Sequence, residues 1–318
     1  MKQLWIFLCC AMAMLGAHAQ GWPDKPITLV VPGAAGTAAD VVARKMGERL
    51  REKLGQPVVV VNRPGAGGLI AYDSVARQKP DGYTLAIVAG GFAIFPVVFK
   101  NSTVDPLRDL TPVAQLAFTP MVFAARPETP FASLGDVTAA ARSGRRLTYG
   151  TSGSASTAHL VGESFKQAAG VDIAYVGYSS SSLLIPDIIS GRVDIGILDS
   201  VSAITLVTGG RLKALAIASP ARVPALQGVP TVAEAGIHFT AVGWVGLFGP
   251  AKLPADIVNK LNAAASEAMT TAEMRDLLAK TGSLPATPWV DAAQWKTRFE
   301  DYVRTWGKVA HDAGMKAD

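Results

Sequence analysis

Residues 29–50 read LVVPGAAGTAADVVARKMGERL, which is an apolar, strand-like segment, an uncharged Gly/Ala loop and then an amphipathic helix. Val42, Met46, Leu50 and Leu54 recur at helical spacing. The first N–H groups of a helix lack intrahelical partners, and the helix dipole places positive charge at the same end. This stretch therefore predicts a strand-to-helix loop that can hold an anion on backbone groups.

Both ends of this helix carry sequence signals. Thr37 followed by Asp40 resembles a capping box, with Asp in place of the commoner Glu. Gly55 is well placed as the C-terminal cap, because glycine tolerates the left-handed conformation found there. The helix is thus expected to start at the Gly/Ala loop and to end before Gly55.

A second block repeats the order of strand, small-residue loop and helix. Leu147–Tyr149 is the expected strand, Gly150–Thr157 (GTSGSAST) the loop and Ala158–Ala169 the helix, closed by Gly170. Similar alternation predicts further strands at 27–31, 58–61, 84–88, 173–178, 193–198, 212–218 and 244–248, with helices at 183–190, from Pro254 onward and within 289–318. This pattern indicates an α/β fold with parallel strands, whose ligands bind beyond the carboxyl ends of the strands.

The first twenty residues, MKQLWIFLCCAMAMLGAHAQ, have the pattern of a signal peptide. The apolar run is shorter than the roughly 20 residues that a membrane anchor needs. We expect residues 1–19 to be removed after Ala19 and the mature protein to be periplasmic. Cys9 and Cys10 lie in this segment, so the mature chain would hold no thiol nucleophile, disulfide or cysteine metal site.

Composition favours two domains and a small-molecule ligand. The chain has 318 residues, of which 49% are hydrophobic and 17% charged, with a formal net charge of +5. That length is typical of two domains with a sizeable core. The basic residues are scattered and form no stripe with stacking aromatics, so nucleic-acid binding is not expected.

Motifs for catalysis are missing. Ser152 lies in Gly-Thr-Ser-Gly-Ser, which departs from the GxSxG nucleophile motif at its fifth position. His159, expected near the start of a helix, is better interpreted as part of the capping region than as a triad base. The histidines show no metal-ligand spacing, and PGAGGLIA (64–71) lacks the GxGxxG spacing. Neither a metal nor a cofactor is expected.

Three residues outside the two loops are candidates for ligand contact. Asp199 ends an apolar strand, where its carboxylate could contact a ligand or cap the next helix. Phe92 and Tyr178 are equally compatible with a pocket wall and with the core.

Several motifs occur in order along nearly the whole chain: WPDKPITLVVPGAAGTAADVVAR (22–44), VVVVNRPGAGGLIAYDSVARQKPDGYTL (58–85), YGTSGSASTAHLVGESFK (149–166), GRVDIGILDS (191–200), PTVAEAG (230–236) and GWVGLFGPAKLPADIVNKLN (243–262). Together they strongly resemble the Bug receptor family, the periplasmic solute-binding proteins of tripartite tricarboxylate transporters. The resemblance implies a two-lobed periplasmic-binding-protein fold of type II, with a central ligand cleft and two crossover hinge segments. Lobe I is expected at 20–120 plus 248–318, and lobe II at 121–247.

The resemblance also implies that one loop from each lobe grips a carboxylate, mainly through backbone and small polar groups. The candidate substrate-binding residues are Gly33, Ala34, Ala35, Gly36, Thr37, Ala38, Asp40, Gly91, Phe92, Thr151, Ser152, Gly153, Ser154, Ala155, Ser156, Thr157, Tyr178 and Asp199. This chain departs from the family pattern, which usually has Phe at Gly33, a second glycine at Thr37 and Tyr-Lys-Gly at Tyr178-Ser179-Ser180. A wider mouth at Gly33 could admit a bulkier, for example aromatic, carboxylate.

The leading hypothesis is a non-catalytic, monomeric receptor for a small mono-, di- or tricarboxylate. It would deliver this ligand to a membrane permease with two integral subunits. A ligand sensor that acts on a signalling partner is one alternative. An exported hydrolase using Ser152 or Ser154 is another.

Overall fold

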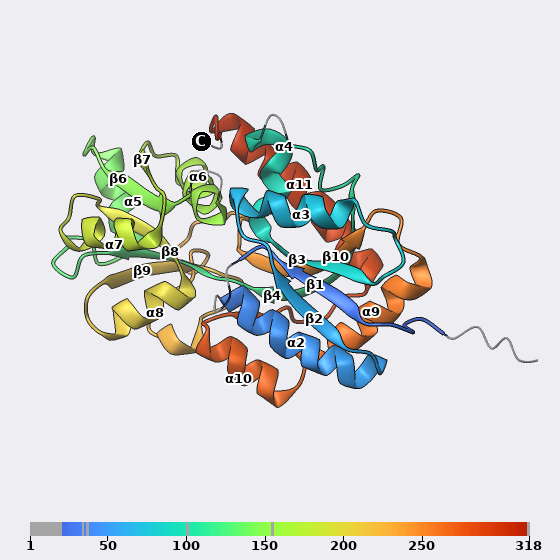
Figure 1. Ribbon diagram of the computed structural model, residues 1–318. Coiled ribbons are helices and arrows are strands. Elements are labelled where there is room, and N and C mark those ends of the chain that lie inside the picture. Colours follow the sequence, from blue (N-terminus) through green and yellow to red (C-terminus); the bar gives the residue numbers. More distant parts are fainter. Residues whose placement is uncertain (1–20, 34, 36–37, 100–101, 154–155, 317–318) are drawn as a thin grey trace, which may run out of the picture.

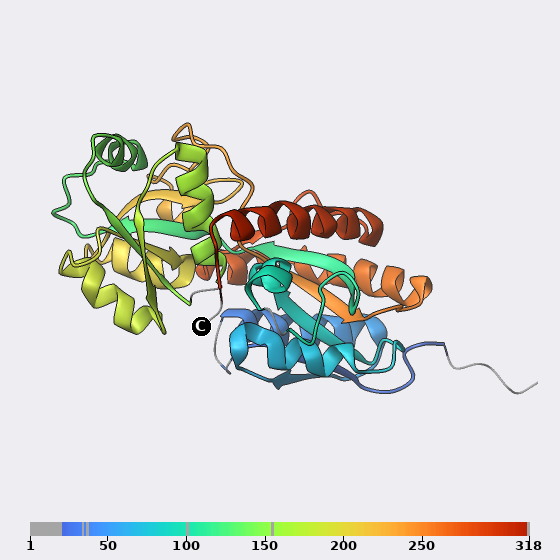
Figure 2. The ribbon, with the colours of Figure 1, turned by 90° about the horizontal axis from the view of Figure 1, so that it is seen from above.

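The computed structural model describes residues 21–316, except for residues 34, 36–37, 100–101 and 154–155. The chain forms two lobes, each built around its own β-sheet, and the lobes lie side by side in both views (Figures 1 and 2). Lobe I is the body around the six-stranded sheet, and lobe II is the body around the five-stranded sheet. The expected α/β, two-lobed architecture is confirmed.

The sheet of lobe I has the strand order β11-β4-β10-β3-β1-β2. β1 pairs in parallel with β2 and β3, and β10 runs antiparallel to both β3 and β4. Its strands are β1 (Ile27–Val31), β2 (Val58–Asn62), β3 (Thr84–Ala89), β4 (Leu110–Phe118), β10 (Trp244–Pro250) and β11 (Leu284–Pro285). The parallel strands at 27–31, 58–62 and 84–89 lie where the sequence predicted them, within one residue.

Helices cover both faces of this sheet (Figure 1). One face carries α2 (Ala38–Leu54), α9 (Ala255–Met269) and α10 (Ala272–Lys280). The other carries α3 (Leu69–Ala76), α4 (Phe95–Val98) and α11 (Ala292–Asp312), with the 3-10 turns η2 (Ala66–Gly68) and η3 (Gly90–Ile94). Gly55 follows α2 with a φ of 71°, as expected for its cap.

The sheet of lobe II has the order β7-β6-β8-β5-β9. β6 is parallel to β7 and β8, whereas β5 is antiparallel to β8 and β9. Its strands are β5 (Met121–Ala125), β6 (Thr148–Ser152), β7 (Ala174–Tyr178), β8 (Ile195–Asp199) and β9 (Lys213–Ala218). Its helices are α5 (Leu134–Arg142), α6 (Thr157–Ala169), α7 (Ser181–Ile189) and α8 (Ser200–Thr208), with η4 at Pro224–Leu226.

The predicted loop at 150–157 is shorter than expected. Gly150, Thr151 and Ser152 belong to β6, because they pair with Val176, Gly177 and Tyr178 of β7. The prediction that these three residues are loop is therefore wrong, and the connection to α6 spans only residues 153–156.

The chain passes between the sheets twice, once at Thr119–Pro120 and once between β9 and β10. The two passages touch, since the N–H of Thr119 donates to the carbonyl of Gly243 over 2.7 Å. A Cβ on Gly243 would lie 2.2 Å from the Thr119 carbonyl oxygen, so this contact requires glycine. Phe248, expected at the second lobe boundary, lies inside β10.

Candidate functional site

A cavity of about 490 Å³ lies between the lobes, beside the two passages. Its walls come from the ends of β3, β4, β8 and β10 and from the first turns of α2, α6 and α8. The lining residues are Ala39, Val42, Ala89, Gly90, Ala117, Val245, Leu278 and Ser283 of lobe I, Met121, Thr157, Asp199, Ser200, Val201 and Ser202 of lobe II, and Thr119 and Trp244 at the passages.

The β1–α2 loop precedes helix α2, whose Ala39 and Val42 line the cavity. Asn62, at the end of β2, donates through Nδ2 to the carbonyl of Gly33 (3.0 Å) and to Asp40 Oδ1 (2.9 Å). Asp40 is 2% exposed and also accepts from Arg44 Nε over 3.0 Å. Asp40 is absent from the cavity lining. Its carboxylate instead links the end of β2 to α2 through Asn62 and Arg44.

The predictions for the rest of this loop have different outcomes. Ala35 is exposed, and Ala38 is the first residue of α2. Ala34, Gly36 and Thr37 lie outside the described residues. The predicted capping box includes Thr37, so it also lies outside them. The N-terminus of α2 contributes Ala39 and Val42 to the cavity wall.

The loop of lobe II connects β6 to α6. Ser156 is the N-cap, and its Oγ accepts a hydrogen bond from the N–H of His159 (3.2 Å). Gly153 has a φ of 89° and donates its N–H to the carbonyl of Tyr178 over 2.7 Å. Thr157 lines the cavity, whereas Ser154 and Ala155 lie outside the described residues.

A buried polar cluster lies behind this second loop. The imidazole of His159 stacks on Tyr175, with ring centroids 3.8 Å apart, and the Tyr175 hydroxyl lies 3.3 Å from Thr151 Oγ1. Glu163, 6% exposed, accepts hydrogen bonds from the Tyr149 hydroxyl and from Lys166 Nζ. Burial, together with the charge of Glu163, raises the pKa of Tyr149. This cluster was not predicted from the sequence, although His159 and Glu163 are spaced i, i+4 on a predicted helix.

The position of Asp199 is compatible with both roles considered from the sequence, the helix cap and the ligand contact. It is the N-cap of α8, where it accepts hydrogen bonds from the N–H (2.9 Å) and the Oγ (3.0 Å) of Ser202. It also lines the cavity. Its carboxylate is therefore held in a defined orientation at the wall of the cleft.

Other predicted site residues point elsewhere. Phe92 is 1% exposed and packs between Tyr72 and Phe95, which makes it a core residue of lobe I. This corrects its interpretation as a ligand contact, because its ring is enclosed by other aromatic rings. The hydroxyl of Tyr178 donates to Asp187 over 2.7 Å.

Two further predicted residues lie at the margin of the site. Ser152 Oγ accepts from Ser181 Oγ over 3.2 Å, which joins β6 to the start of α7. Gly91 lies in η3 next to Gly90, and Gly90 is the one of the two that lines the cavity.

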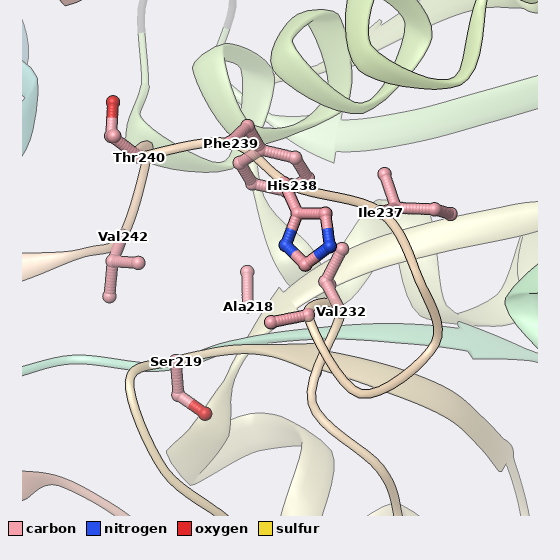
Figure 3. A pocket seen from close by; sticks show the side chains of 9 residues that line it. Ala218, Ser219, Val232, Ile237, His238, Phe239, Thr240 and Val242 are labelled. Carbon is pink, nitrogen blue, oxygen red and sulfur yellow. The ribbon is translucent and has the colours of Figure 1, made fainter.

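A second hollow, of about 260 Å³, lies along the long passage between β9 and β10. Figure 3 shows Ser219, His238, Phe239 and Thr240 around it. His238 is exposed, and none of the predicted site residues lines this hollow. The cavity between the lobes is therefore the stronger candidate for the ligand site.

Among the described residues, no cluster of three or more His, Cys, Asp or Glu side chains is arranged to hold a metal ion. No helix in that part of the chain is both long and apolar enough to cross a membrane.

Comparison with known proteins identifies the family. The family model described as "Tripartite tricarboxylate transporter family receptor" (TctC) matches residues 42–315. Protein BugT of Bordetella pertussis is 31% identical over 320 residues, covering 98% of this chain and 96% of BugT.

Two solved structures support the same assignment. The Rhodopseudomonas palustris protein Rpa4515, solved with adipate, is 33% identical with a TM-score of 0.77, covering 92% of this chain and 99% of that one. MatC from the same organism, solved with bound malate, is 31% identical with a TM-score of 0.74, covering 91% and 99%. This chain belongs to the TctC family of periplasmic tripartite tricarboxylate transporter receptors, to which the Bug proteins also belong.

Proposed function

We propose that this protein captures a small carboxylate between its lobes in the periplasm and delivers it to the membrane permease of a tripartite tricarboxylate-type transporter. The observation that carries the proposal is the cavity between the lobes, with the N-terminal turns of α2 and α6 in its wall. Each helix N-terminus stabilises an anion by roughly 0.3–1 kcal/mol. The solved relatives named with adipate and malate support a carboxylate as the ligand.

The proposed grip consists of Gly33–Ala38 in lobe I and Thr151–Thr157 in lobe II. Both segments contain only Gly, Ala, Ser and Thr, so small side chains let the backbone approach the ligand. A grip of neutral donors also suits a carrier, because a buried ion pair would be costly to break on release. Closure of the lobes about the Thr119–Gly243 contact would complete the site.

A thermal-shift screen of mono-, di- and tricarboxylates tests this function. A ligand at 100 times its dissociation constant should add about 2.7 kcal/mol to the free energy of unfolding. Thr157→Val should weaken the effect, whereas Thr205→Val, on an exposed position of α8 outside the cavity, should not. Stabilisation by neutral sugars or by cations, and by no carboxylate, would refute the proposal.

Delivery and export need separate tests. We expect the periplasmic protein to begin at Gln20, after removal of residues 1–19, which N-terminal sequencing would show. Uptake of the identified carboxylate should fall when the gene is deleted and return on complementation. Normal uptake in the deletion strain, with binding intact in vitro, would favour the sensor role instead.

A further inference from the structure

A hollow of about 340 Å³ lies at the outer end of lobe I, between the turn before β4, the turn after β10 and the first half of α11. The residues of this outer hollow that matter here are Leu107, Arg108, Lys252, Lys296, Phe299 and Glu300. We propose that it docks an acidic segment of a partner protein, in which a carboxylate lies next to an apolar side chain. The outer hollow shares no lining residue with the cavity between the lobes, so this inference goes beyond carboxylate capture.

Lys252 has an unfavourable backbone conformation in this hollow. It lies in the turn between β10 and α9 with a φ of 65°, which is disfavoured for any residue with a Cβ, whereas glycine adopts it at no steric cost. Its side chain is exposed, and among the residues that the structure describes its ammonium group has no hydrogen-bond or ion-pair partner. Lysine here therefore costs stability without a compensating contact inside the chain. Such strained positions are concentrated where a side chain serves binding.

The charges around Lys252 leave a positive excess. Arg108 donates through Nε and Nη2 to Asp109, each over 2.8 Å, but its side chain remains 71% exposed. Lys296 Nζ and Glu300 Oε1 are 3.8 Å apart and both side chains are exposed, so this ion pair is weak. The lining holds three cations and one carboxylate, and an excess remains when Asp109 is counted as well. An acidic segment complements this surface.

Leu107 supplies the apolar part of the hollow. It is 49% exposed, yet the turn that carries it is fixed by hydrogen bonds. The N–H groups of Leu107 and Arg108 both donate to Asp105 Oδ1 over 2.9 Å, and the N–H of Asp105 donates to Asp109 Oδ2 over 2.8 Å. An apolar side chain of the partner placed on Leu107 would remove both surfaces from water. The acidic residue beside it would pair with Lys252.

The outer hollow belongs to lobe I alone. Its two turns are joined directly, because the N–H of Ala251 donates to the carbonyl of Asp109 over 3.0 Å. β4 runs from this hollow to the passage at Thr119, so the hollow and the hinge lie at opposite ends of the strand. Movement of lobe II would leave the shape of the hollow unchanged. A partner docked here therefore requires no particular state of the cleft.

Nuclear magnetic resonance on the mature protein tests this docking with a short blocked peptide in which Glu and Leu alternate. Amide shifts are expected around Leu107, Lys252 and Lys296. They should diminish when the salt concentration rises from about 0.1 M to about 1 M, because exposed charges are screened. The same peptide with Gln in place of Glu should bind about fivefold more weakly. Equal binding of the two peptides, or no shifts in the outer hollow, would overturn the inference.

Lys252→Gly should have two opposite effects. Its Tm should rise, because glycine relieves the left-handed conformation, while its affinity for the Glu–Leu peptide should fall about fivefold. Lys252→Arg should keep the affinity, since the charge is retained. Lys79→Gly is the matched control, at an exposed lysine outside the hollow whose φ is not positive. It should neither raise the Tm nor change the affinity.

The pair of glycine variants also separates a defined site from general charge attraction. An equal loss of peptide affinity in Lys79→Gly and Lys252→Gly would mean that the peptide responds only to net charge, which overturns the docking site. Unchanged affinity in Lys252→Gly would show that the lysine does not serve binding, with the same consequence. These outcomes leave carboxylate capture in the cleft untouched, because no residue of the outer hollow lines the cleft.

Discussion

The two loops proposed to hold the ligand have similar compositions but different supports. In lobe I, Asn62 joins Gly33 to Asp40, and the guanidinium of Arg44 next to them is half exposed. In lobe II, the β6–α6 loop lies against the buried polar cluster, which consists of His159, Tyr175, Tyr149, Glu163 and Lys166. The first support is a short hydrogen-bonded link, and the second is part of the lobe's core.

This difference implies unequal sensitivity of the two lobes. A buried polar group that loses its partner has a large energetic cost, because it was removed from water on folding. A partly exposed link can be replaced by water at a lower cost. We therefore expect changes behind the lobe II loop to reduce stability most, and changes behind the lobe I loop to act more on ligand affinity.

The largest effect is expected for Glu163→Ala. It removes the acceptor of the Tyr149 hydroxyl and of Lys166 inside lobe II, and should lower the free energy of unfolding by about 3 kcal/mol. Urea unfolding would measure this. Glu300→Ala, which removes an exposed partner of Lys296, should cost under about 1 kcal/mol. Similar losses in both variants would mean that the cluster is not a main support.

Gly243→Ala should have the next largest effect and should act on both lobes together. The new Cβ would lie 2.2 Å from the Thr119 carbonyl and would push the two passages apart. Such overpacking costs about 1–3 kcal/mol, and ligand affinity should fall because the loops no longer meet correctly. Gly228→Ala, where a Cβ would contact nothing within 4 Å, is the control. Unchanged stability and affinity would argue against a rigid contact at the hinge.

The difference between the lobes also shows what the sequence could and could not predict. Helix α2 was placed correctly from Val42, Met46 and Leu50, whose 3.6-residue period is a local property. Gly150–Ser152 was interpreted as loop because glycine and serine are poor strand formers, and pairing with β7 overrode that propensity.

The supports behind the loops depend on contacts distant in sequence. Asn62 is separated from Gly33 by 29 positions, and no local pattern predicts that link. Phe92 was ambiguous for the same reason, because only the packing of Tyr72 and Phe95 around it makes it a core residue. For Asp199 the capping alternative is confirmed, since capping is a local property, and its contact with a ligand stays a prediction.

Asn62→Ala tests the lobe I support and should have a smaller effect on stability, about 1–2 kcal/mol. It removes the hydrogen bonds to Gly33 and to Asp40. Carboxylate affinity should fall about tenfold, which corresponds to about 1.4 kcal/mol. Asn259→Ala, at an exposed position of α9, should change neither quantity. A greater stability loss than in Glu163→Ala would reverse the comparison between the lobes.

Alkaline pH should reveal the smallest difference, through one buried tyrosine in each lobe. Burial raises the pKa of Tyr72 to about 12, and burial together with the charge of Glu163 also raises the pKa of Tyr149. The unfolded chain loses these protons near pH 10, whereas the folded protein keeps them. Stability that is fully present below pH 10 is therefore lost as the pH rises above it.

Tyr72→Phe and Tyr149→Phe should each reduce the loss of stability between pH 9 and pH 11 by about 1.3 kcal/mol, measured by urea unfolding. An unchanged loss of stability between pH 9 and pH 11 in either variant would show that burial does not keep that tyrosine protonated in the folded protein.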